Sequence, residues 1–534
     1  MNYLFKKQRG RTALMNHFSC FSMIYKTFYK GLKDKEKIIL FMNFYTFVNH
    51  NHYCMSFEEI VAFIVNIVWS PALIVVCLAA GLFFSILTRF VQIRRFKEMI
   101  NLLFAKKDKH RTGVSSFQAF CMAISGRVGT GNIVGVATAI AFGGPGSIFW
   151  MWIIAFLGSS SAFVESTLAQ IYKEKHGDQL RGGPSYFIEK GLHCKWLAIA
   201  FAVSTILGCG FLLPSVQSNG VALAFNNALD IKAIYIGIGL AVLLGLVIMG
   251  GVKRIANVAE IVAPFMAIGY MLMVLVILVF YLDKIPGVFL LIFKSAFGLH
   301  PVYGAIIGST IMWGVKRGIF SNEAGQGSCP IIAAAADVSH PVKQGLVQAF
   351  SVYIDTLLIC TATALMILVT GMYNVFYESG QVLVENAPQL SNQYVVFTQA
   401  AVDKVISGFG NIFVASALLF FVFTTLMAYY YYAETSIVYL FGKKKWGSFT
   451  VWALRLLIVI AVFYGSLKQA TLAWQLGDIG VGLMAWINLA AIFLLFPKAI
   501  RSLKDYEQQK KKGIDPLFDP EKLNIKKAEF WEKK

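Results

Sequence analysis

Residues 125–135 read Ser-Gly-Arg-Val-Gly-Thr-Gly-Asn-Ile-Val-Gly and lie inside an apolar run that extends from residue 115 to residue 141. Four glycines in this short stretch disfavour a continuous helix, because each glycine in a helix interior costs up to about 1 kcal/mol relative to alanine. The sequence therefore predicts a helix that unwinds here. A second stretch of the same kind, residues 314–327, reads Gly-Val-Lys-Arg-Gly-Ile-Phe-Ser-Asn-Glu-Ala-Gly-Gln-Gly.

The composition indicates that both stretches lie in a membrane. The chain has 534 residues, of which 57% are hydrophobic and 14% are charged, and it contains 45 phenylalanines. This composition excludes a disordered protein and an ordinary soluble enzyme. Continuous apolar runs of about 20 residues predict helices, whereas barrel strands would be shorter and would alternate in polarity. We therefore expect an all-α polytopic membrane protein with eleven transmembrane helices, at 58–88, 115–141, 146–172, 196–226, 232–250, 257–281, 302–326, 344–372, 409–440, 451–467 and 471–496.

The lysines and arginines between these runs predict the orientation of the chain. Thirty of them lie in alternate segments, namely 89–111, 173–195, 253–254, Lys343, 443–445 and the tail 498–534. Only Lys232, Lys284, Lys294, Lys404 and Lys468 lie in the segments between. Because basic residues concentrate on the cytoplasmic side, we expect a cytoplasmic C-terminus. Most of the net charge of +20 is then explained by the basic residues of the cytoplasmic loops and tail, and no nucleic-acid partner is expected.

The first 54 residues do not fit this pattern. They contain nine basic and two acidic residues but would lie outside the cell. No small-residue cleavage site follows their short apolar stretch, so a signal peptide is not indicated. One interpretation is that translation starts at Met55 and that residues 1–54 are not made. The alternative is a genuine N-terminal extension with its own re-entrant segment.

The ten runs that follow the first helix divide into two sets of five, and each set opens with one of the glycine-rich stretches. Interrupted helices at corresponding positions of two halves are typical of secondary transporters with inverted repeats, whose substrate lies near the membrane midplane. A repeat with an odd number of helices must be inverted. We therefore expect a first helix with a basic loop (55–114), a first repeat (115–282), a second repeat (302–496) and a cytoplasmic Lys-rich tail (497–534).

Unwound backbone provides chemistry for a solute and an ion. Free peptide N–H groups and the positive end of a half-helix suit a carboxylate, while free carbonyl groups suit Na⁺. The alternative interpretation is close helix packing through small residues. Packing alone does not explain why Arg127, Asn132, Asn322 and Glu323 occur in the same stretches.

Other classes of protein have less support. The eight cysteines form no CxxC pair, the HExxH motif is absent, and no strand precedes the GxGxxxG spacing at residues 129–135, so neither a metal centre nor a dinucleotide cofactor is indicated. The spans contain no Ser/His or paired-Asp motif for an intramembrane enzyme. A channel would require a polar stripe or rings of like charge, and only isolated charges occur. A carrier that is not an enzyme and needs no cofactor is the leading hypothesis.

Several motifs together resemble the alanine or glycine:cation symporter family, of the sodium:alanine symporter type. They are the stretch 125–140 with Gly-Gly-Pro-Gly-Ser-Ile-Phe-Trp-Met-Trp (143–152), Arg-Gly-Gly-Pro-Ser-Tyr-Phe (181–187) and Lys-Arg-Gly-Ile-Phe-Ser-Asn-Glu-Ala-Gly-Gln-Gly-Ser (316–328), and the similarity extends from about Met55 to Pro497. The resemblance implies sodium-coupled uptake of a small neutral amino acid, alanine or glycine, by a multi-pass protein of the bacterial plasma (inner) membrane. It also implies a five-plus-five inverted-repeat (LeuT-like) core, as in the neurotransmitter:sodium symporters.

The resemblance also implies the substrate contacts. The break formed by Gly129, Thr130, Gly131 and Asn132 would hold the substrate carboxylate, and Gln217, Thr425 and Tyr429 match further contact positions. Many family members have a Gly-Trp pair where this chain has Ala428-Tyr429. Because the tyrosine ring is smaller and carries a hydroxyl, a different substrate, such as serine or glutamine, is an alternative. Coupling to protons instead of sodium is a further alternative.

For sodium, the likeness of fold points to carbonyl groups near Ser125 and Val128 and to the hydroxyls of Thr424 and Thr425. A threonine in a membrane helix can instead bond only to its own i−4 carbonyl. Charges within spans are expensive and usually paired or functional, and they occur here at Arg127, Glu165, Glu260, Glu323, Asp355 and Glu434. We expect Arg127 and Glu165 to form a structural pair, with a gating role for Arg127, Glu165 or Glu323 as the alternative.

Overall fold

The computed structural model describes residues 56–104, 113–390, 394–442 and 444–532. The predicted extension of residues 1–54 and the alternative start at Met55 lie outside the described residues. The helical elements are α3 (Phe57–Val68), α4 (Pro71–Leu87), α5 (Val91–Arg94), α6 (Phe96–Leu103), α7 (Ser116–Arg127), η1 (Gly131–Gly135), α8 (Val136–Gly143), α9 (Ser147–Ile171), α10 (Pro184–Leu192), α11 (Lys195–Leu207), η2 (Gly208–Leu212), α12 (Leu213–Leu229), α13 (Ala233–Ile248), α14 (Gly251–Phe280), η3 (Leu282–Lys284), α15 (Ile285–Ala296), η4 (Tyr303–Ile306), α16 (Ile307–Asn322), α17 (Cys329–Ala335), α18 (Pro341–Val352), η5 (Tyr353–Cys360), α19 (Thr361–Thr370), α20 (Val395–Asp403), α21 (Gly410–Phe441), α22 (Gly447–Ser466) and α23 (Ala470–Lys511).

Among the described residues, strands are short and lie in two antiparallel hairpins. β1 (Glu174–His176) pairs with β2 (Gln179–Arg181), and β3 (Asn374–Phe376) pairs with β4 (Val382–Glu385). The described part of the chain contains no closed sheet, so the expected helical class is confirmed: the protein is a polytopic α-helical membrane protein.

Each of the eleven predicted runs coincides with helical structure. Among the described residues, eight helical segments are both long and apolar enough to cross a membrane. The other three runs differ for identifiable reasons. Runs 115–141 and 302–326 are interrupted, and run 232–250 corresponds to α13, which has 16 residues. The described structure therefore supports several membrane spans without fixing their number at eleven.

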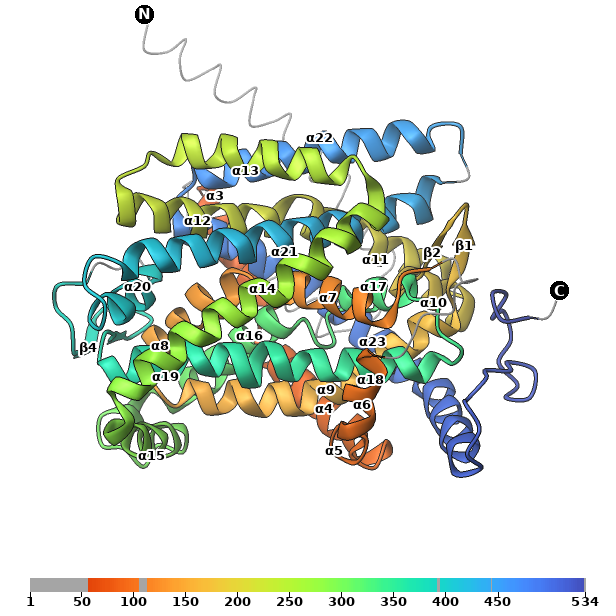
Figure 1. The fold of residues 1–534 in the computed structure, drawn as a ribbon, viewed down its shortest axis with the longest axis horizontal. Coiled ribbons are helices and arrows are strands. Elements are labelled where there is room, and N and C mark those ends of the chain that lie inside the picture. The colour runs from red at the N-terminus through yellow and green to blue at the C-terminus, as the bar shows by residue number, and fades with distance from the viewer. Residues whose placement is uncertain (1–55, 105–112, 391–393, 443, 533–534) are drawn as a thin grey trace, which may run out of the picture. The chain divides into compact units, whose positions relative to one another are not determined.

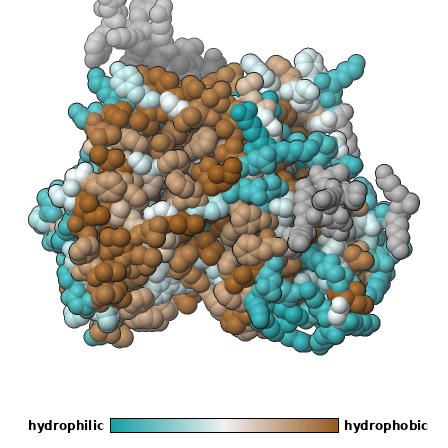
Figure 2. Space-filling view, viewed as in Figure 1, coloured by the Kyte–Doolittle hydropathy of each residue, from teal (hydrophilic) through white to brown (hydrophobic). Residues whose placement is uncertain are grey.

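Large apolar side chains on the surface indicate where lipid contacts the protein. On α14, Ile261, Phe265 and Phe280 are each about two-thirds or more exposed, and Figure 2 shows hydrophobic residues covering much of the face that carries α13, α14 and α22. Exposed apolar patches of this size are unfavourable in water. The surface therefore fits a hydrocarbon environment.

The helices pack in pairs that are far apart in sequence (Figure 1). α9 packs against α18, α12 against α21, and α13 against α22. In addition, α16 packs against α8, and α17 packs against α7. Since the first half of each interrupted helix contacts the second half of the other, the two interrupted helices run antiparallel and meet at their breaks.

In the described part of the chain, three π-helical segments, η1, η2 and η5, lie within otherwise α-helical spans. Such wide turns change the direction of neighbouring side chains and are frequent at functional sites. Asn132 lies in η1 and Asp355 lies in η5. These two segments contact each other beside the first break.

Candidate functional site

The first break separates α7 from η1. A capping box between Ser115 and Gln118 starts α7, which ends at Arg127, and Val128 leaves the helical conformation with φ −80° and ψ 95°. A Cβ placed on Gly129 would lie 2.7 Å from both Gln217 Oε1 and Thr425 Oγ1. A side chain at residue 129 would therefore displace two polar side chains that approach the backbone here.

Gln217 connects the first break to α21. Its Oε1 accepts hydrogen bonds from the backbone N–H and the hydroxyl of Thr130, each at 3.0 Å, and its Nε2 donates to Tyr429 Oη at 3.3 Å. All three side chains are buried. The structure thus brings together three of the predicted substrate residues, with one amide side chain in the middle.

Asn132 connects the break to η5. Its Oδ1 accepts from the Gly129 N–H at 2.9 Å, and its Nδ2 donates to Asp355 Oδ1 at 2.7 Å. Ser321, near the end of α16, donates to Asp355 Oδ2 at 2.9 Å, and the Thr356 hydroxyl donates to the same oxygen at 2.7 Å. Asp355 therefore receives hydrogen bonds from both interrupted helices.

Gly131 lies at a close approach between the two interrupted helices. A Cβ on Gly131 would lie 3.2 Å from Ser321 Cα. The missing side chain allows the backbones of η1 and α16 to approach each other directly.

The residues predicted to bind sodium are only partly brought together. The Thr425 hydroxyl lies 3.1 Å from the Val128 carbonyl oxygen and 2.9 Å from the Phe421 carbonyl oxygen, its own i−4 position. Ser125 lies one turn before Val128, and its Oγ is buried without a hydrogen-bond partner in the described structure. Thr424, in contrast, bonds to the Phe421 carbonyl at 2.9 Å, with its hydroxyl 3.6 Å from the Met266 sulfur.

The second break lies between α16 and α17. Glu323 has a φ of +55°, and Gly325 and Gly327 have φ values of +78° and +85°. Glu323 Oε2 accepts from Tyr432 Oη at 2.9 Å and from Ser328 Oγ at 3.0 Å. Buried atoms without partners in the described structure gather along this break: Asn322 Nδ2, Glu323 Oε1 and both amide atoms of Gln326. The break thus carries unused hydrogen-bonding capacity.

The expected pair of Arg127 and Glu165 is not formed in the described structure, and this prediction is wrong. Arg127 Nη1 donates to the Gln348 carbonyl oxygen at 3.2 Å and to Ser351 Oγ. Glu165 accepts from Asn488 Nδ2 at 2.6 Å and from the Gly325 N–H at 3.2 Å. Two helices that are neighbours in the sequence need not turn their charged side chains toward each other. Here the side-chain partner of Glu165 is Asn488 of α23.

Lys316 and Arg317 share one buried carboxylate. Lys316 Nζ lies 2.7 Å from Asp478 Oδ2, and Arg317 Nη1 lies 3.0 Å from Asp478 Oδ1. The guanidinium of Arg317 also stacks over the ring of Trp474, 4.5 Å from its centroid, and over Trp313 at 4.9 Å. These contacts link α16 to α23.

The other charges within spans also have partners. Glu434 forms an ion pair with Arg181 at 2.8 Å. Glu260 accepts a hydrogen bond from Gln118 Nε2 at 3.0 Å. The first contact joins α21 to the β1–β2 hairpin, and the second joins α14 to the start of α7.

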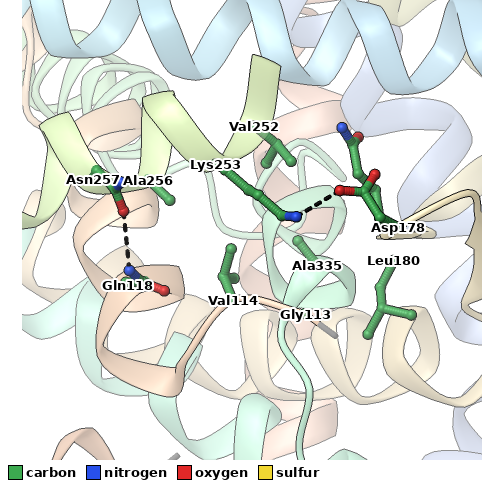
Figure 3. Close-up of a pocket in the computed structure, with 11 residues that line it drawn as sticks. Gly113, Val114, Gln118, Asp178, Leu180, Val252, Lys253, Ala256, Asn257 and Ala335 are labelled. Carbon is green, nitrogen blue, oxygen red and sulfur yellow. Dashed lines mark hydrogen bonds and ion pairs between the residues drawn. The ribbon is translucent and has the colours of Figure 1, made fainter. Parts of the chain in front are cut away.

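A cavity of about 360 Å³ lies between the start of α7, the start of α14, the β1–β2 turn and the end of α17 (Figure 3). Lys253 and Asp178 form an ion pair at 2.5 Å across it, and this hydrogen bond and charge lower the pKa of Asp178. On α7, Gln118 faces the cavity and Ser125 follows two turns later, about 10 Å along the helix. The cavity thus lies on the side of the site toward the start of α7.

A family model described as the sodium:alanine symporter family matches residues 54–520. The chain belongs to the sodium:alanine symporter family. The resemblance seen in the glycine-rich motifs is therefore confirmed, and the protein is a transporter rather than an enzyme.

Curated relatives agree with this membership. A putative sodium/proton-dependent alanine carrier protein of Bacillus subtilis (strain 168) is 57% identical over 475 residues, covering 89% of this chain and 98% of that protein. A sodium/proton-dependent alanine carrier protein of Bacillus sp. (strain PS3) is 50% identical, covering 81% and 97%. A probable sodium/glutamine symporter of Bacillus subtilis (strain 168) is 44% identical, covering 89% and 96%.

Sequence reasoning missed three members of the clusters around the two breaks. Ser321 had no assigned role although it precedes Asn322 in the second motif, and Asp355 was noted only as a charge within a span. Asp478, the partner of Lys316 and Arg317, was not singled out at all. Its position inside the last apolar run was the available signal, because charged residues in spans are usually paired or functional.

Proposed function

We propose that this symporter couples the import of a small neutral amino acid, alanine first, to the entry of Na⁺ by alternating access. One observation carries the proposal. Asn132, from the first break, and Ser321, beside the second, bind the same buried carboxylate of Asp355. A ligand that occupies this junction can change the relative position of both interrupted helices, which is what coupled transport requires.

The substrate carboxylate is assigned to the Gly129–Asn132 break. In the structure the Gly129 N–H is bonded to Asn132 Oδ1 and the Thr130 N–H to Gln217 Oε1. An arriving carboxylate supplies the same kind of acceptor oxygen, so it can replace these side-chain oxygens without leaving a buried N–H unpaired. Thr425 and Tyr429, on α21, are assigned to the rest of the substrate.

The coupling cation is assigned to oxygens near the same break. The Val128 carbonyl, the Thr425 hydroxyl and the unpartnered Ser125 hydroxyl are hard oxygen donors of the kind that suit Na⁺. The carboxylate of Asp355 is held by the neutral side chains of Asn132, Ser321 and Thr356, and no described lysine or arginine forms an ion pair with it. A buried unpaired charge is costly, and a bound cation lowers that cost.

We further propose eleven transmembrane helices, with a first helix followed by two inverted repeats of five. The pairing of α8 with α16, α9 with α18, α12 with α21 and α13 with α22 supports this arrangement, because each pair joins corresponding members of the two sets. The distribution of basic residues supports a plasma-membrane protein with its C-terminus and the Gln118 cavity on the cytoplasmic side.

Purified protein in liposomes tests this function. With labelled alanine outside and an inward sodium gradient, we expect accumulation above equilibrium that collapses when a sodium ionophore is added. Protein-free liposomes serve as the control. Accumulation that follows an imposed proton gradient without sodium contradicts the ion assignment, and flux that never exceeds equilibrium contradicts symport.

Glutamine is a second candidate substrate. The Ala428-Tyr429 pair supports it, because this pair replaces the Gly-Trp of many family members, and one relative is named a probable sodium/glutamine symporter. Competition of labelled alanine uptake by unlabelled glutamine, serine and glycine ranks these substrates. Stronger competition by glutamine than by unlabelled alanine contradicts the alanine assignment.

A further inference from the structure

The last helix continues well beyond the membrane and is followed by a segment that folds back onto the protein. α23 has 42 residues and is therefore about 63 Å long, whereas a bilayer core is about 30 Å thick. After α23 the chain continues without regular structure to residue 532 and appears as the dark-blue coil at the C-terminal end in Figure 1. We call residues 513–531 the C-terminal strap.

The strap is anchored first at the turn between α17 and α18. Ser339 Oγ donates to the Pro516 carbonyl oxygen at 2.9 Å, and the Phe518 N–H donates to the Ser339 carbonyl oxygen at 3.0 Å. Lys343 Nζ forms an ion pair with Asp515 Oδ1 at 2.6 Å. Two hydrogen bonds to Ser339 and one ion pair to Lys343 thus hold the start of the strap.

The end of the strap is anchored at α9. Trp531 Nε1 donates to the Gln170 carbonyl oxygen at 2.9 Å. The ammonium group of Lys173 lies 4.3 Å from the ring centroid of Phe530 and 4.7 Å from that of Trp531. Cation–π contacts of this kind, together with a hydrogen bond to the helix end, fix the position of two aromatic rings.

A third anchor is α10, and a fourth is α23 itself. Lys190 Nζ lies 3.1 Å from Glu529 Oε2, and Lys527 Nζ lies 3.0 Å from His193 Nδ1. Lys522 Nζ lies 2.7 Å from Asp505 Oδ1. The strap therefore contacts elements from both predicted repeats, since α9 and α10 belong to the first and the α17–α18 turn to the second.

Burial indicates that this is a packed contact and not a loose tail. Phe518, Ile525 and Ala528 are buried, with exposed fractions of 7%, 3% and 0%. The Phe518 ring lies edge-on to His340 at 5.4 Å and to Trp531 at 5.2 Å. The salt bridges are partly exposed, and exposed ion pairs contribute little by themselves. The strap is therefore held mainly by its buried side chains and backbone hydrogen bonds, while its ion pairs can separate.

From these contacts we propose that the C-terminal strap is an autoinhibitory latch that ties the two repeats together on the cytoplasmic side and slows the conformational cycle. The proposal rests on the alternating-access function and orientation given above. Alternating access requires one repeat or bundle to move against the other, and a link anchored on both sides must yield or stretch when they move. The match to the family model ends at residue 520, within the strap.

Deletion of residues 513–534 tests the latch. In the liposome assay, we expect the Vmax of sodium-driven alanine uptake to rise at least twofold, with KM for alanine and for sodium unchanged within twofold. A Vmax that is unchanged or lower, in a variant that elutes as a single species and binds alanine as the wild type does, overturns the proposal.

Point variants provide the test if the deletion variant does not fold. Phe518→Ala removes a buried ring that packs on His340, and Trp531→Ala removes the contact with α9. Lys526→Ala is the matched control, because Lys526 is an exposed lysine of the strap. We expect the first two to raise Vmax and the control to leave it unchanged. Equal Vmax values for all three variants and the wild type contradict the latch.

A reversible cross-link tests the opposite change. We would join Lys343→Cys and Asp515→Cys with a short bis-methanethiosulfonate reagent in a Cys194→Ser background, because Cys194 is a partly exposed free thiol. Each of the two cysteine substitutions alone in that background serves as a control. Cross-linking is expected to lower uptake at least fivefold, and dithiothreitol is expected to restore it. Uptake that is unaffected by a complete cross-link contradicts the latch.

The two proposals fail in different ways. Absence of sodium-driven alanine uptake by the wild-type protein contradicts the proposed function. A wild-type protein that transports alanine at the same Vmax as the deletion variant contradicts the latch alone.

Discussion

Gln217 donates a hydrogen bond from Nε2 to Tyr429 Oη at 3.3 Å while its Oε1 holds the Thr130 N–H and hydroxyl. The amide therefore has two separable functions, one toward the first break and one toward α21. Removing each function separately tells which one positions the substrate.

Gln217→Ala leaves the Thr130 N–H unpaired in a buried site, which costs about 1–3 kcal/mol. Because the substrate carboxylate then pairs this N–H without displacing Gln217 Oε1, we expect KM for alanine to fall about fivefold or more. Tyr429→Phe removes only the single bond to Nε2, so alanine uptake is expected to change by less than about threefold. Uptake kinetics in liposomes measure both values. Equal effects of the two substitutions would show that the Thr130 contact has no special role.

Gly129 and Gly135 form a matched pair within one segment of chain. An added Cβ at Gly129 lies 2.7 Å from two buried polar atoms, whereas one at Gly135 lies 3.8 Å from its nearest neighbour. We therefore expect Gly129→Ala to reduce alanine uptake at least tenfold and Gly135→Ala to retain most of it. Initial rates at equal protein density measure the difference. Similar losses at both positions would contradict the assignment of the break to substrate contacts.

The two glycine-rich stretches allowed much of this site to be predicted from the sequence. Local composition favours the breaks at Val128–Thr130 and after Asn322, because glycine is unfavourable in a helix interior. Partners from distant helices could not be predicted in the same way. Asp478 lies 161 residues from Arg317, and Asn488 lies 323 residues from Glu165.

The wrong pairing of Arg127 with Glu165 has the same cause. Both residues were correctly placed in helices that are neighbours in sequence, but the direction of a side chain depends on the rotation of its helix, which packing determines. The π-helical segments change that rotation further, and apolar runs give no signal for them. Local structure was therefore predicted more successfully than the contacts between helices.

Asp355→Asn tests the proposed contribution of the carboxylate to ion coupling. Asparagine has a similar shape and one acceptor oxygen, so it can keep a bond from Ser321 while removing the negative charge. We expect the sodium concentration for half-maximal alanine uptake to rise at least tenfold, with a smaller change in KM for alanine at saturating sodium. Thr424→Val is the control, since the Thr424 hydroxyl lies toward Met266. An unchanged sodium dependence in Asp355→Asn would contradict this assignment.

Asp478→Asn tests whether the charges on α16 stabilise the protein as a unit. The substitution leaves Lys316 and Arg317 buried without their carboxylate, and breaking a buried ion pair in this way costs about 3–5 kcal/mol. We expect a clearly lower Tm in detergent, measured by tryptophan fluorescence. Lys316→Met combined with Asp478→Asn removes one of the two buried cations that lack a carboxylate partner. We expect the Tm of this double variant to lie between those of Asp478→Asn and the wild type. A double variant no more stable than Asp478→Asn would indicate that the three charges do not act together.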